Sequence, residues 1–370
     1  MRTRPAFALA TVLVVLLLTE SASYLTARWL TRYALFYVPV DTRDYATYLV
    51  RRDPELGWVM PSSLGTTELD ASGSRLVPSF PDPDDSAACG SVFGDSFTYG
   101  DGVTSAEAYP NVLAQRLGCR VNNFGMSGYG TDQALLRYRR LADVAGGFVV
   151  LGHYSDDIVR NVNQLRDFHT GGRYLLKPRF VLEEGKLRLV PLPTLGADEF
   201  AHLPDDADRL LPYDWFRPGG PAGIVTLRFP YTWSILQLLG QYRVRAALQG
   251  VPPYAAFYDP AHPSGAFDLT VAILDTFARE AQQHGQRPLI LVIPDIADLR
   301  MLRAGRPLPY APLVAALGRH GIEVVDGGLE LDRTVGERDP CVVYIACRRG
   351  HLTPEGQRAL GDALAERLHH

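Results

Sequence analysis

The chain has 370 residues, of which 46% are hydrophobic and 21% are charged, so it can bury a sizeable core in one large or two modest domains. Its formal net charge of -4 gives no basic surface for binding nucleic acid, and we expect no nucleic-acid partner. The sequence has no His-Glu-x-x-His, paired Cys-x-x-Cys, phosphate-loop or dinucleotide motif. We therefore expect neither a metal centre nor a cofactor.

The N-terminus has the pattern of a secretory signal or a signal anchor. Residues 1–5 include two arginines, and residues 6–18 form an apolar run. That run alone is short for a membrane-spanning helix, but its continuation to Trp29 gives sufficient length. We favour an uncleaved transmembrane anchor over residues 1–35. Everything after about Arg32 would then lie outside the cytoplasm, in the periplasm or at the cell exterior.

Residues 36–88 are interpreted as a lead-in and linker. Residues 53–61 are rich in turn formers and contain one aromatic side chain, Trp58. Residues 78–85 are rich in proline and aspartate, which is typical of an exposed acidic linker. We assign packing, and no chemistry, to residues 53–61.

The four cysteines agree with export from the cytoplasm. Cys89 and Cys119 each open a predicted strand, so in a parallel sheet they could be neighbours at the same end. Cys341 and Cys347 bracket a short segment. Among the three pairings that four cysteines allow, we prefer the disulfides Cys89–Cys119 and Cys341–Cys347. Such bonds persist in oxidising compartments.

The region from 89 to 370 alternates predicted strands and helices, the βαβ pattern of a parallel sheet covered on both faces. We expect an α/β fold, a three-layer αβα sandwich around five parallel strands in the flavodoxin-like order. The predicted strands are 89–94, 120–124, 147–151, 288–293 and 322–325, and the predicted helices are 106–117, 132–144, 269–284, 311–320 and 357–368.

An insertion over about residues 159–267 interrupts this alternation. Residues 180–190 predict a β-hairpin that turns at Glu184-Gly185, and residues 231–248 predict a helix. Because the insertion follows the carboxyl end of the third strand, it would overhang the rim where loops set substrate choice. Packing on the anchor is the alternative.

Two motifs carry the candidate chemistry. Gly94-Asp95-Ser96 ends a buried apolar strand, so it would place a serine hydroxyl beside backbone N–H groups freed by the turn into a helix. Asp-Ser before a helix is also an ordinary N-cap. His351 lies just outside the final helix, for which Thr353 is a plausible N-cap and Pro354 the first residue.

In their order, these motifs resemble those of the SGNH hydrolases, also called the GDSL esterase/lipase family, in its membrane-anchored bacterial form. Gly94-Asp95-Ser96 matches the first block of the family, and the stretch from Asn123 to Gly128 matches the second. The third block, normally Gly-x-Asn-Asp, falls on Tyr154-Ser155-Asp156-Asp157, and the fourth, normally Asp-x-x-His, on Arg348-Arg349-Gly350-His351. The resemblance spans Cys89 to Leu368.

The resemblance implies a mechanism. His351 would take the proton from Ser96, and Ser96 would attack an ester carbonyl to give an acyl-enzyme. The oxyanion would be bound by the backbone N–H groups of Ser96 and Gly128 and by the side chain of the third block, which is Asp156.

Asp156 stands where the family has asparagine. A protonated carboxyl, its pKa raised by burial, could donate a hydrogen bond as the amide does, whereas an ionised one would repel the oxyanion. A slip of one residue would place Asp157 there. Alternatively Asn161 or Asn163 lends its amide, or Asp156 and Asp157 cap a helix over residues 158–163.

The fourth block has Arg348 where the family has the aspartate that orients the histidine, and arginine has no acceptor for the imidazole N–H. Either a Ser-His dyad operates with a backbone carbonyl, or an acid comes from elsewhere. The candidates are Asp326 at the end of a strand, Asp339 in the preceding loop, and Asp156.

Two functional hypotheses follow. The first is a serine esterase that hydrolyses acetyl or short-chain O-acyl esters of a cell-surface glycan or lipid, or an O-acyltransferase of the same chemistry. The second is a catalytically impaired domain that binds such a glycan, and it draws on the altered third and fourth blocks.

Overall fold

A computed structural model describes residues 4–33, 35–37, 45–59, 68–81, 88–170, 175–203, 205–347 and 350–369. It divides into two compact units. The anchor unit consists of Met1–Tyr48, Asn163–Leu175 and Pro193–Pro253, and the sheet unit consists of Leu49–Val162, Leu176–Leu192 and Tyr254–His370.

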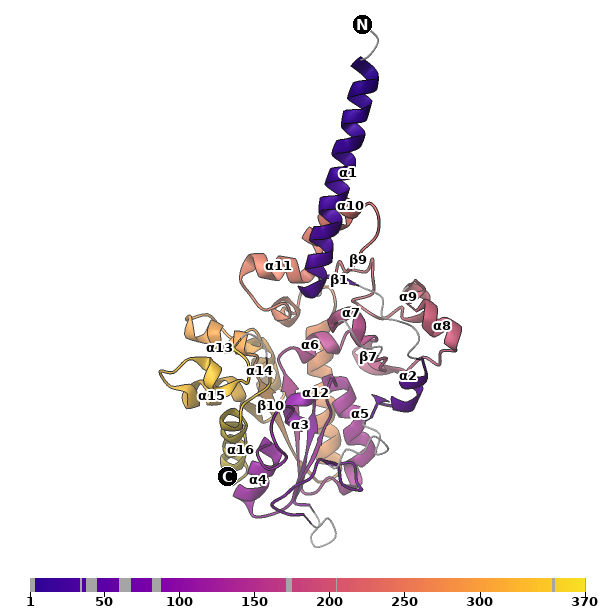
Figure 1. Ribbon diagram of the computed structural model, residues 1–370. Coiled ribbons are helices and arrows are strands. Elements are labelled where there is room, and N and C mark those ends of the chain that lie inside the picture. The colour runs from indigo at the N-terminus through magenta and orange to yellow at the C-terminus, as the bar shows by residue number, and fades with distance from the viewer. Residues whose placement is uncertain are drawn as a thin grey trace. The chain divides into compact units, whose positions relative to one another are not determined.

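The sheet unit is built on five parallel strands, which appear edge-on in Figure 1. Their order across the sheet is β11-β10-β6-β4-β5, and all four adjacent pairs run parallel. Read from β5, the strands of the sheet follow the chain order 2-1-3-4-5, which confirms the predicted flavodoxin-like arrangement. The strands are β4 (Gly90–Gly94), β5 (Val121–Gly125), β6 (Phe148–Tyr154), β10 (Arg287–Ile293) and β11 (Val324–Asp326).

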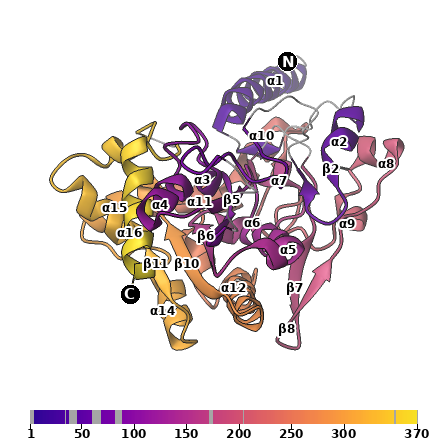
Figure 2. The ribbon, with the colours of Figure 1, turned by 90° about the horizontal axis from the view of Figure 1, so that it is seen from below.

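Helices cover both faces of this sheet, which confirms the three-layer sandwich (Figure 2). One layer contains α4 (Tyr109–Leu117), α15 (Gly327–Val335) and α16 (Pro354–His369). The other contains α5 (Thr131–Leu141), α12 (Ala266–Gln283) and α14 (Ala311–Arg319). The strands between them are almost wholly buried because both faces are covered. The central strands β6 and β10 accordingly have apolar runs without alternation, Phe148–Leu151 and Pro288–Ile293.

The sheet unit also contains short elements at its edges. The predicted hairpin is present, and Glu184 and Gly185 at its turn both adopt positive φ. The remaining elements are β2 (Arg52–Asp53) and β3 (Gly57–Trp58), which pair antiparallel, β7 (Arg179–Glu183), β8 (Lys186–Val190), α3 (Ser96–Tyr99), α6 (Asp157–Arg160), α13 (Ile296–Arg303), and the 3-10 turns η4 (Ala142–Val144), η6 (Ala255–Tyr258) and η7 (Pro340–Val343).

Both predicted disulfides are present in the sheet unit. Cys89 and Cys119 have Cα atoms 6.1 Å apart, and those of Cys341 and Cys347 are 4.8 Å apart. The first bond ties the start of β4 to the start of β5, because those two strands are parallel neighbours.

The anchor unit begins with α1 (Arg4–Leu30), a 27-residue helix that runs into η1 (Thr31–Tyr33). The span Phe7–Tyr33 is long and apolar enough to cross a membrane. The other elements are β1 (Phe36–Tyr37) and β9 (Val225–Thr226), which pair parallel, α7 (Arg166–Thr170), α8 (Ala197–His202), α9 (Ala207–Leu210), α10 (Tyr231–Gln237), η5 (Leu238–Gly240) and α11 (Tyr242–Gln249), and α2 (Tyr45–Arg51) starts in this unit.

The prediction of a single helix over residues 231–248 is wrong, because the helical structure is interrupted after Gly240. Gln241 is extended, with φ -71° and ψ 137°, and its side-chain amide donates to the carbonyl of Leu35 at 2.8 Å. Glycine has low helix propensity, and this contact with the segment after α1 supports the break.

Some predictions fall on residues outside the described ranges. These are the second half of the acidic linker, residues 82–85, the end of the lead-in motif, residues 60–61, and Arg348 and Arg349 of the fourth block. The domain limits at 35, 88, 159 and 267 stay predictions.

Candidate active site

Ser96 is the first residue of α3, directly after the sharp turn at the end of β4. The Asp95 carboxylate caps this helix by accepting a hydrogen bond from the N–H of Phe97 at 2.8 Å. The Ser96 side chain is 7% exposed. The local structure therefore agrees with the prediction from the motif. The strand β4 ends at Gly94, Asp95 caps the helix α3, and Ser96 is the first residue of that helix.

The turn from β4 into α3 is packed tightly against the end of β5. A Cβ atom on Gly125, at the end of β5, would lie 2.2 Å from the N atom of Tyr99, and one on Gly94 would lie 2.2 Å from the hydroxyl of Thr98. The N–H of Met126 donates to the carbonyl of Gly94 at 3.0 Å, which joins the ends of the two strands. Only glycine fits at these two positions, so the first and second blocks meet at one edge of the sheet.

His351 reaches Ser96 from the loop before α16. Its Nε2 atom lies 2.9 Å from the Ser96 hydroxyl, within hydrogen-bond distance. The imidazole also lies against the Phe97 ring, with centroids 4.8 Å apart. Its backbone carbonyl accepts a hydrogen bond from the N–H of Ile345 at 2.8 Å, which fixes the loop. The structure thus brings together the two residues predicted as nucleophile and base.

Two backbone donors next to this pair have no acceptor. Within the described ranges, neither the N–H of Ser96 nor that of Gly128 donates a hydrogen bond to a protein group. Gly128 has a φ of +86°, and a Cβ there would be 3.3 Å from the Trp58 ring. The Trp58 indole N–H donates to the carbonyl of Ser127 at 3.1 Å. The lead-in region therefore supports the second-block loop through Trp58.

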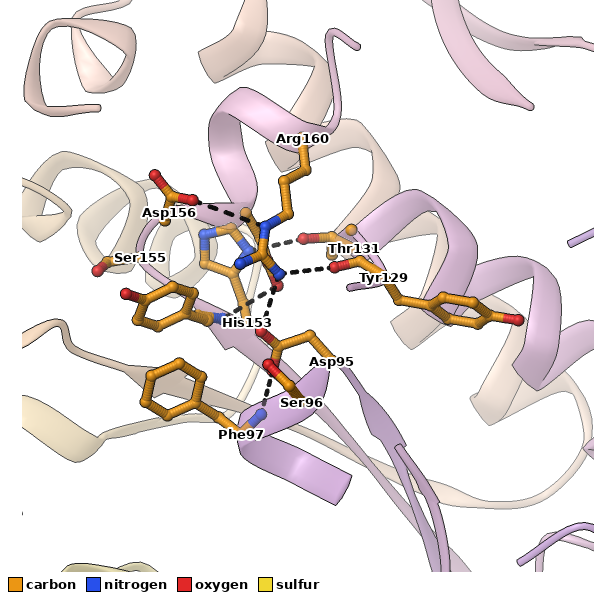
Figure 3. Close-up of polar contacts among 12 residues, drawn as sticks. Asp95, Ser96, Phe97, Tyr129, Thr131, His153, Ser155, Asp156 and Arg160 are labelled. Atoms are coloured by element: carbon orange, nitrogen blue, oxygen red, sulfur yellow. Dashed lines mark hydrogen bonds and ion pairs between the residues drawn. The ribbon is translucent and has the colours of Figure 1, made fainter. Parts of the chain in front are cut away.

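A buried arginine, Arg160, occupies the centre of the polar network behind Ser96 (Figure 3). It donates to the Asp95 carboxylate at 2.9 Å and to the carbonyl of Tyr129 at 2.8 Å. It also forms ion pairs with Asp157 at 2.7 Å and with Asp156 at 3.6 Å. Burial alone would lower the pKa of Arg160, but the surrounding carboxylates raise it above its ordinary value. One cation therefore balances the helix cap of the nucleophile and both acids of the third block.

Asp156 occupies the N-cap position of α6, but its side chain makes no capping hydrogen bond. The Asp157 carboxylate accepts from the N–H of Tyr154 at 3.3 Å. The alternative amides are engaged elsewhere. Asn161 donates to the Thr270 hydroxyl at 2.9 Å, and Asn163, in the anchor unit, donates to the carbonyl of Leu165 at 2.7 Å.

The candidate orienting acids hydrogen-bond to other groups. Asp326 caps α15 by accepting from the N–H of Gly328 at 2.9 Å, and Asp339 caps η7 by accepting from the N–H of Cys341 at 2.8 Å. Among the described residues, no carboxylate accepts a hydrogen bond from His351. The structure therefore gives Asp326 and Asp339 capping contacts, and it pairs Asp156 with Arg160.

Asp101, which the sequence did not single out, is the acid nearest to the imidazole. Its carboxylate lies 4.0 Å from Nε2 of His351, the same nitrogen that contacts Ser96. Ser127 donates its hydroxyl proton to this carboxylate, with oxygens at 2.7 and 2.8 Å. Burial raises the pKa of Asp101, while the Ser127 hydrogen bond and the charge of His351 act to lower it. Asp101 can therefore stabilise a proton on Nε2, although it does not orient Nδ1.

His153 on β6 is wholly buried beside the site and makes two hydrogen-bond contacts, to Thr131 at 2.7 Å and to Tyr258 at 2.9 Å. Burial lowers its pKa to about 3, so the imidazole stays neutral at physiological pH. It is a structural histidine. In the described ranges, no cluster of three His, Cys, Asp or Glu side chains could hold a metal ion.

No family model and no curated protein matches the chain. Among solved structures, it is similar to a member of the lipolytic protein G-D-S-L family from Veillonella parvula, at 11% identity and a TM-score of 0.35, over 75% of this chain and 95% of that chain. It is also similar to an alpha/beta hydrolase enzyme from the metagenome of Lake Arreo, Spain, at 16% identity and a TM-score of 0.40, over 76% and 95% of the two chains. These likenesses are distant.

Sequence reasoning missed Arg160 and Asp101. The sequence could have indicated the ion pairs of Arg160, because Arg160 follows Asp157 by three residues and Asp156 by four, which is the spacing of ion pairs on one helix. The sequence contains no indication of a role for Asp101, since an aspartate between two glycines is typical of any turn.

Proposed function

We propose that this chain is a serine ester hydrolase of the SGNH type that acts through a Ser-His mechanism. The observation that carries the proposal is the 2.9 Å contact between the Ser96 hydroxyl and Nε2 of His351, at a helix N-terminus with two unpaired backbone N–H groups. Nucleophile, base and oxyanion donors are the three parts that acyl transfer requires.

In the proposed reaction, Nε2 of His351 takes the hydroxyl proton of Ser96 while the serine oxygen bonds to the ester carbonyl carbon. The N–H groups of Ser96 and Gly128 bind the resulting oxyanion, and the ester C–O bond breaks as Nε2 returns the proton to the departing alkoxide. Water then repeats these steps on the acyl-enzyme and releases the acid. An acceptor alcohol in place of water would make the same site an O-acyltransferase.

Asp156 is the proposed third member of the oxyanion hole, by its place in the third block. Its carboxylate lies 3.6 Å from the Arg160 guanidinium, and it stands where the family has an amide donor. The substitution Asp156→Asn supplies that amide, so we expect it to raise kcat. One oxyanion donor is worth about 10²–10³-fold in other serine hydrolases, which sets an upper bound. A lower kcat in the variant would show that the carboxyl already assists.

Among the described residues no carboxylate accepts a hydrogen bond from His351, which supports a slow enzyme. Loss of that acid costs about 10⁴-fold in the serine-protease template. The same observation supports the alternative, a catalytically impaired protein that binds an acylated glycan. The two differ in whether Ser96 is chemically activated.

We further propose that the substrate is an O-acyl ester of a cell-surface glycan or lipid, and that the sheet unit lies outside the cytoplasm. The apolar N-terminal helix and the two disulfides support this location.

The test is the release of nitrophenol from short-chain nitrophenyl esters by the full chain in detergent micelles, together with labelling by a fluorophosphonate that reacts with activated serines. We expect turnover and a single label on Ser96, both absent in Ser96→Ala.

The chain offers a matched control for this test. The Ser264 hydroxyl lies 2.8 Å from Nδ1 of His262, a distance similar to that between Ser96 and His351. Unlike Ser96, Ser264 is not the first residue of a helix. Ser264→Ala should leave turnover and labelling unchanged. Equal labelling of Ser264 and Ser96, or no label on Ser96, would contradict an activated nucleophile and favour the binding protein.

A further inference from the structure

The helix α10 of the anchor unit exposes a row of large apolar side chains. Trp233 and Leu236 lie in α10, Phe229 lies just before it and Leu239 lies in the following turn η5, and all four are between 52% and 72% exposed. Their spacing of three residues places Trp233 and Leu236 on one side of the helix. The opposite side is buried, with Ser234 and Leu238 inside. We call these four side chains the α10 stripe. Single exposed apolar residues are ordinary, but a row of four marks a surface that another apolar phase covers.

The α10 stripe adjoins the apolar helix α1. Within the anchor unit α10 contacts α1, and the two run side by side in Figure 1. The rings of Tyr24 and Tyr231 lie 4.9 Å apart, and Ala27 of α1 shares a small core with Leu238. The apolar side chains of α1, such as Leu13 and Leu17, are themselves more than half exposed. The stripe is therefore continuous with the surface by which α1 would contact lipid.

The polar contacts of Glu20 also join α1 to α10. Glu20 is the one acidic residue of the apolar span of α1, and its carboxylate accepts hydrogen bonds from the N–H groups of Tyr231 at 2.6 Å and Thr232 at 3.3 Å. Ser23 pairs with the Thr232 hydroxyl at 2.8 Å. In a bilayer, polar groups of a spanning helix must find protein partners because water is absent. The N-terminus of α10 supplies those partners to α1.

The length of the apolar span places the contacts between α1 and α10 within the thickness of a bilayer. About 20 apolar residues cross the hydrocarbon core of about 30 Å. Counted from Phe7, that length reaches about Thr26, so the contacts at Glu20, Ser23 and Tyr24 fall within the leaflet at the carboxyl end of α1. Trp29 and Trp233 are both exposed, and tryptophan is enriched at membrane interfaces.

Charge agrees with a lipid surface. Residues 219–258 contain three arginines, Arg228, Arg243 and Arg245, and no aspartate or glutamate, whereas the whole chain has a net charge of -4. Arg228 forms an ion pair with Asp205 at 2.7 Å, so Arg243 and Arg245 carry the excess positive charge. Positive charge beside an apolar stripe is the composition of segments that lie on anionic bilayers.

We propose that α10 is a second membrane-contacting element, whose stripe of Phe229, Trp233, Leu236 and Leu239 inserts into the leaflet at the carboxyl end of α1. The occupant of the surface is the lipid bilayer. The proposal rests on the insertion of α1 and is independent of the ester chemistry. The chain would then be held by a spanning helix and an interfacial one, rather than by a single flexible tether.

The test uses the full chain reconstituted in vesicles of phosphatidylcholine and phosphatidylglycerol. All four cysteines are in disulfides, so a single introduced cysteine can be labelled with an environment-sensitive fluorophore. Leu236→Cys probes the stripe, and Leu13→Cys in α1 is the reference for lipid contact. Leu329→Cys is the matched control, because Leu329 is a leucine of similar exposure on α15 of the sheet unit. Leu236 is exposed, so its replacement should not disturb folding.

We expect the fluorophore at position 236 to show blue-shifted emission and quenching by spin-labelled lipids comparable to those at position 13. At position 329 we expect emission as in water and no quenching. The proposal is overturned if position 236 behaves like position 329 while position 13 is quenched. It is also overturned if position 13 is not quenched, since α1 then does not insert, or if all three positions are quenched alike.

Discussion

The network around Arg160 makes a quantitative prediction about the sheet unit. Arg160→Met removes the buried cation and leaves the carboxylates of Asp95 and Asp157, which are almost wholly buried, without their main counter-charge. Removal of one partner from a buried ion pair costs about 3–5 kcal/mol of unfolding free energy. Because whole domains are stable by only about 5–15 kcal/mol, this loss is large.

The assay follows urea unfolding of the full chain in detergent through the fluorescence of Trp58. Trp58 is the only tryptophan of the sheet unit, so phenylalanine at the other three positions makes the signal specific to that unit. Arg279→Met is the matched control. Arg279 pairs with Asp275 at 2.8 Å but is mostly exposed, and such pairs contribute about 0–1 kcal/mol.

A double-mutant cycle with Asp157→Asn isolates the ion pair from packing. In the Arg160→Met background, Asp157→Asn should be less destabilising than in the wild type, or stabilising, because the buried charge is already unpaired. We expect a coupling energy of about 1–3 kcal/mol. Effects that add within about 0.5 kcal/mol would refute the reasoning, since the two residues would then act independently.

Three further outcomes follow from the site. The His153 pKa of about 3 lies below its value of 6.5 in the unfolded chain, so stability is lost as pH falls below 6.5. Between pH 7.5 and pH 5 the wild type should lose about 2 kcal/mol more than His153→Gln in urea titrations, and equal losses would contradict the buried neutral imidazole. Asp101→Asn keeps the Ser127 contact but removes the charge 4.0 Å from Nε2, so kcat on nitrophenyl esters should fall roughly tenfold, about 1.4 kcal/mol, with KM unchanged. A rise in KM with kcat unchanged would instead assign Asp101 to substrate binding. Gly125→Ala places a Cβ against the Tyr99 backbone and should lower the urea midpoint strongly, whereas Gly118→Ala, where no atom lies within 4 Å, should change it only by the modest strain of its positive φ.

The sheet could be predicted from the sequence because most of its strands are short apolar runs that end at turn residues. The run from Cys89 to Gly94 and the run from Pro288 to Ile293 carry that signal, and the structure has β4 and β10 there. The Ser96–His351 pair could be predicted from its two motifs, since each motif fixes its own local structure. The order of the strands followed from the right-handed crossover rule.

The rest depended on contacts between segments far apart in the chain. The helix expected over residues 231–248 has a continuous helical pattern, and its break at Gln241 depends on Leu35, about 200 residues earlier. The capping contacts of Asp326 and Asp339 are local, but the sequence offered no means to choose capping over catalysis. The α13 and α15 helices are short and begin directly at strand ends, where the pattern is dominated by turn residues.

The distance along the chain between Ser96 and His351 has a consequence for biogenesis. The two residues are 255 positions apart, and the His351 loop is followed only by α16. That helix docks on α4, where Gln357 accepts a hydrogen bond from the N–H of Tyr109 at 2.9 Å. A chain synthesised from its N-terminus therefore contains Ser96 long before His351. The proposed chemistry needs both side chains, so it would begin only after the His351 loop and α16 have been made and packed.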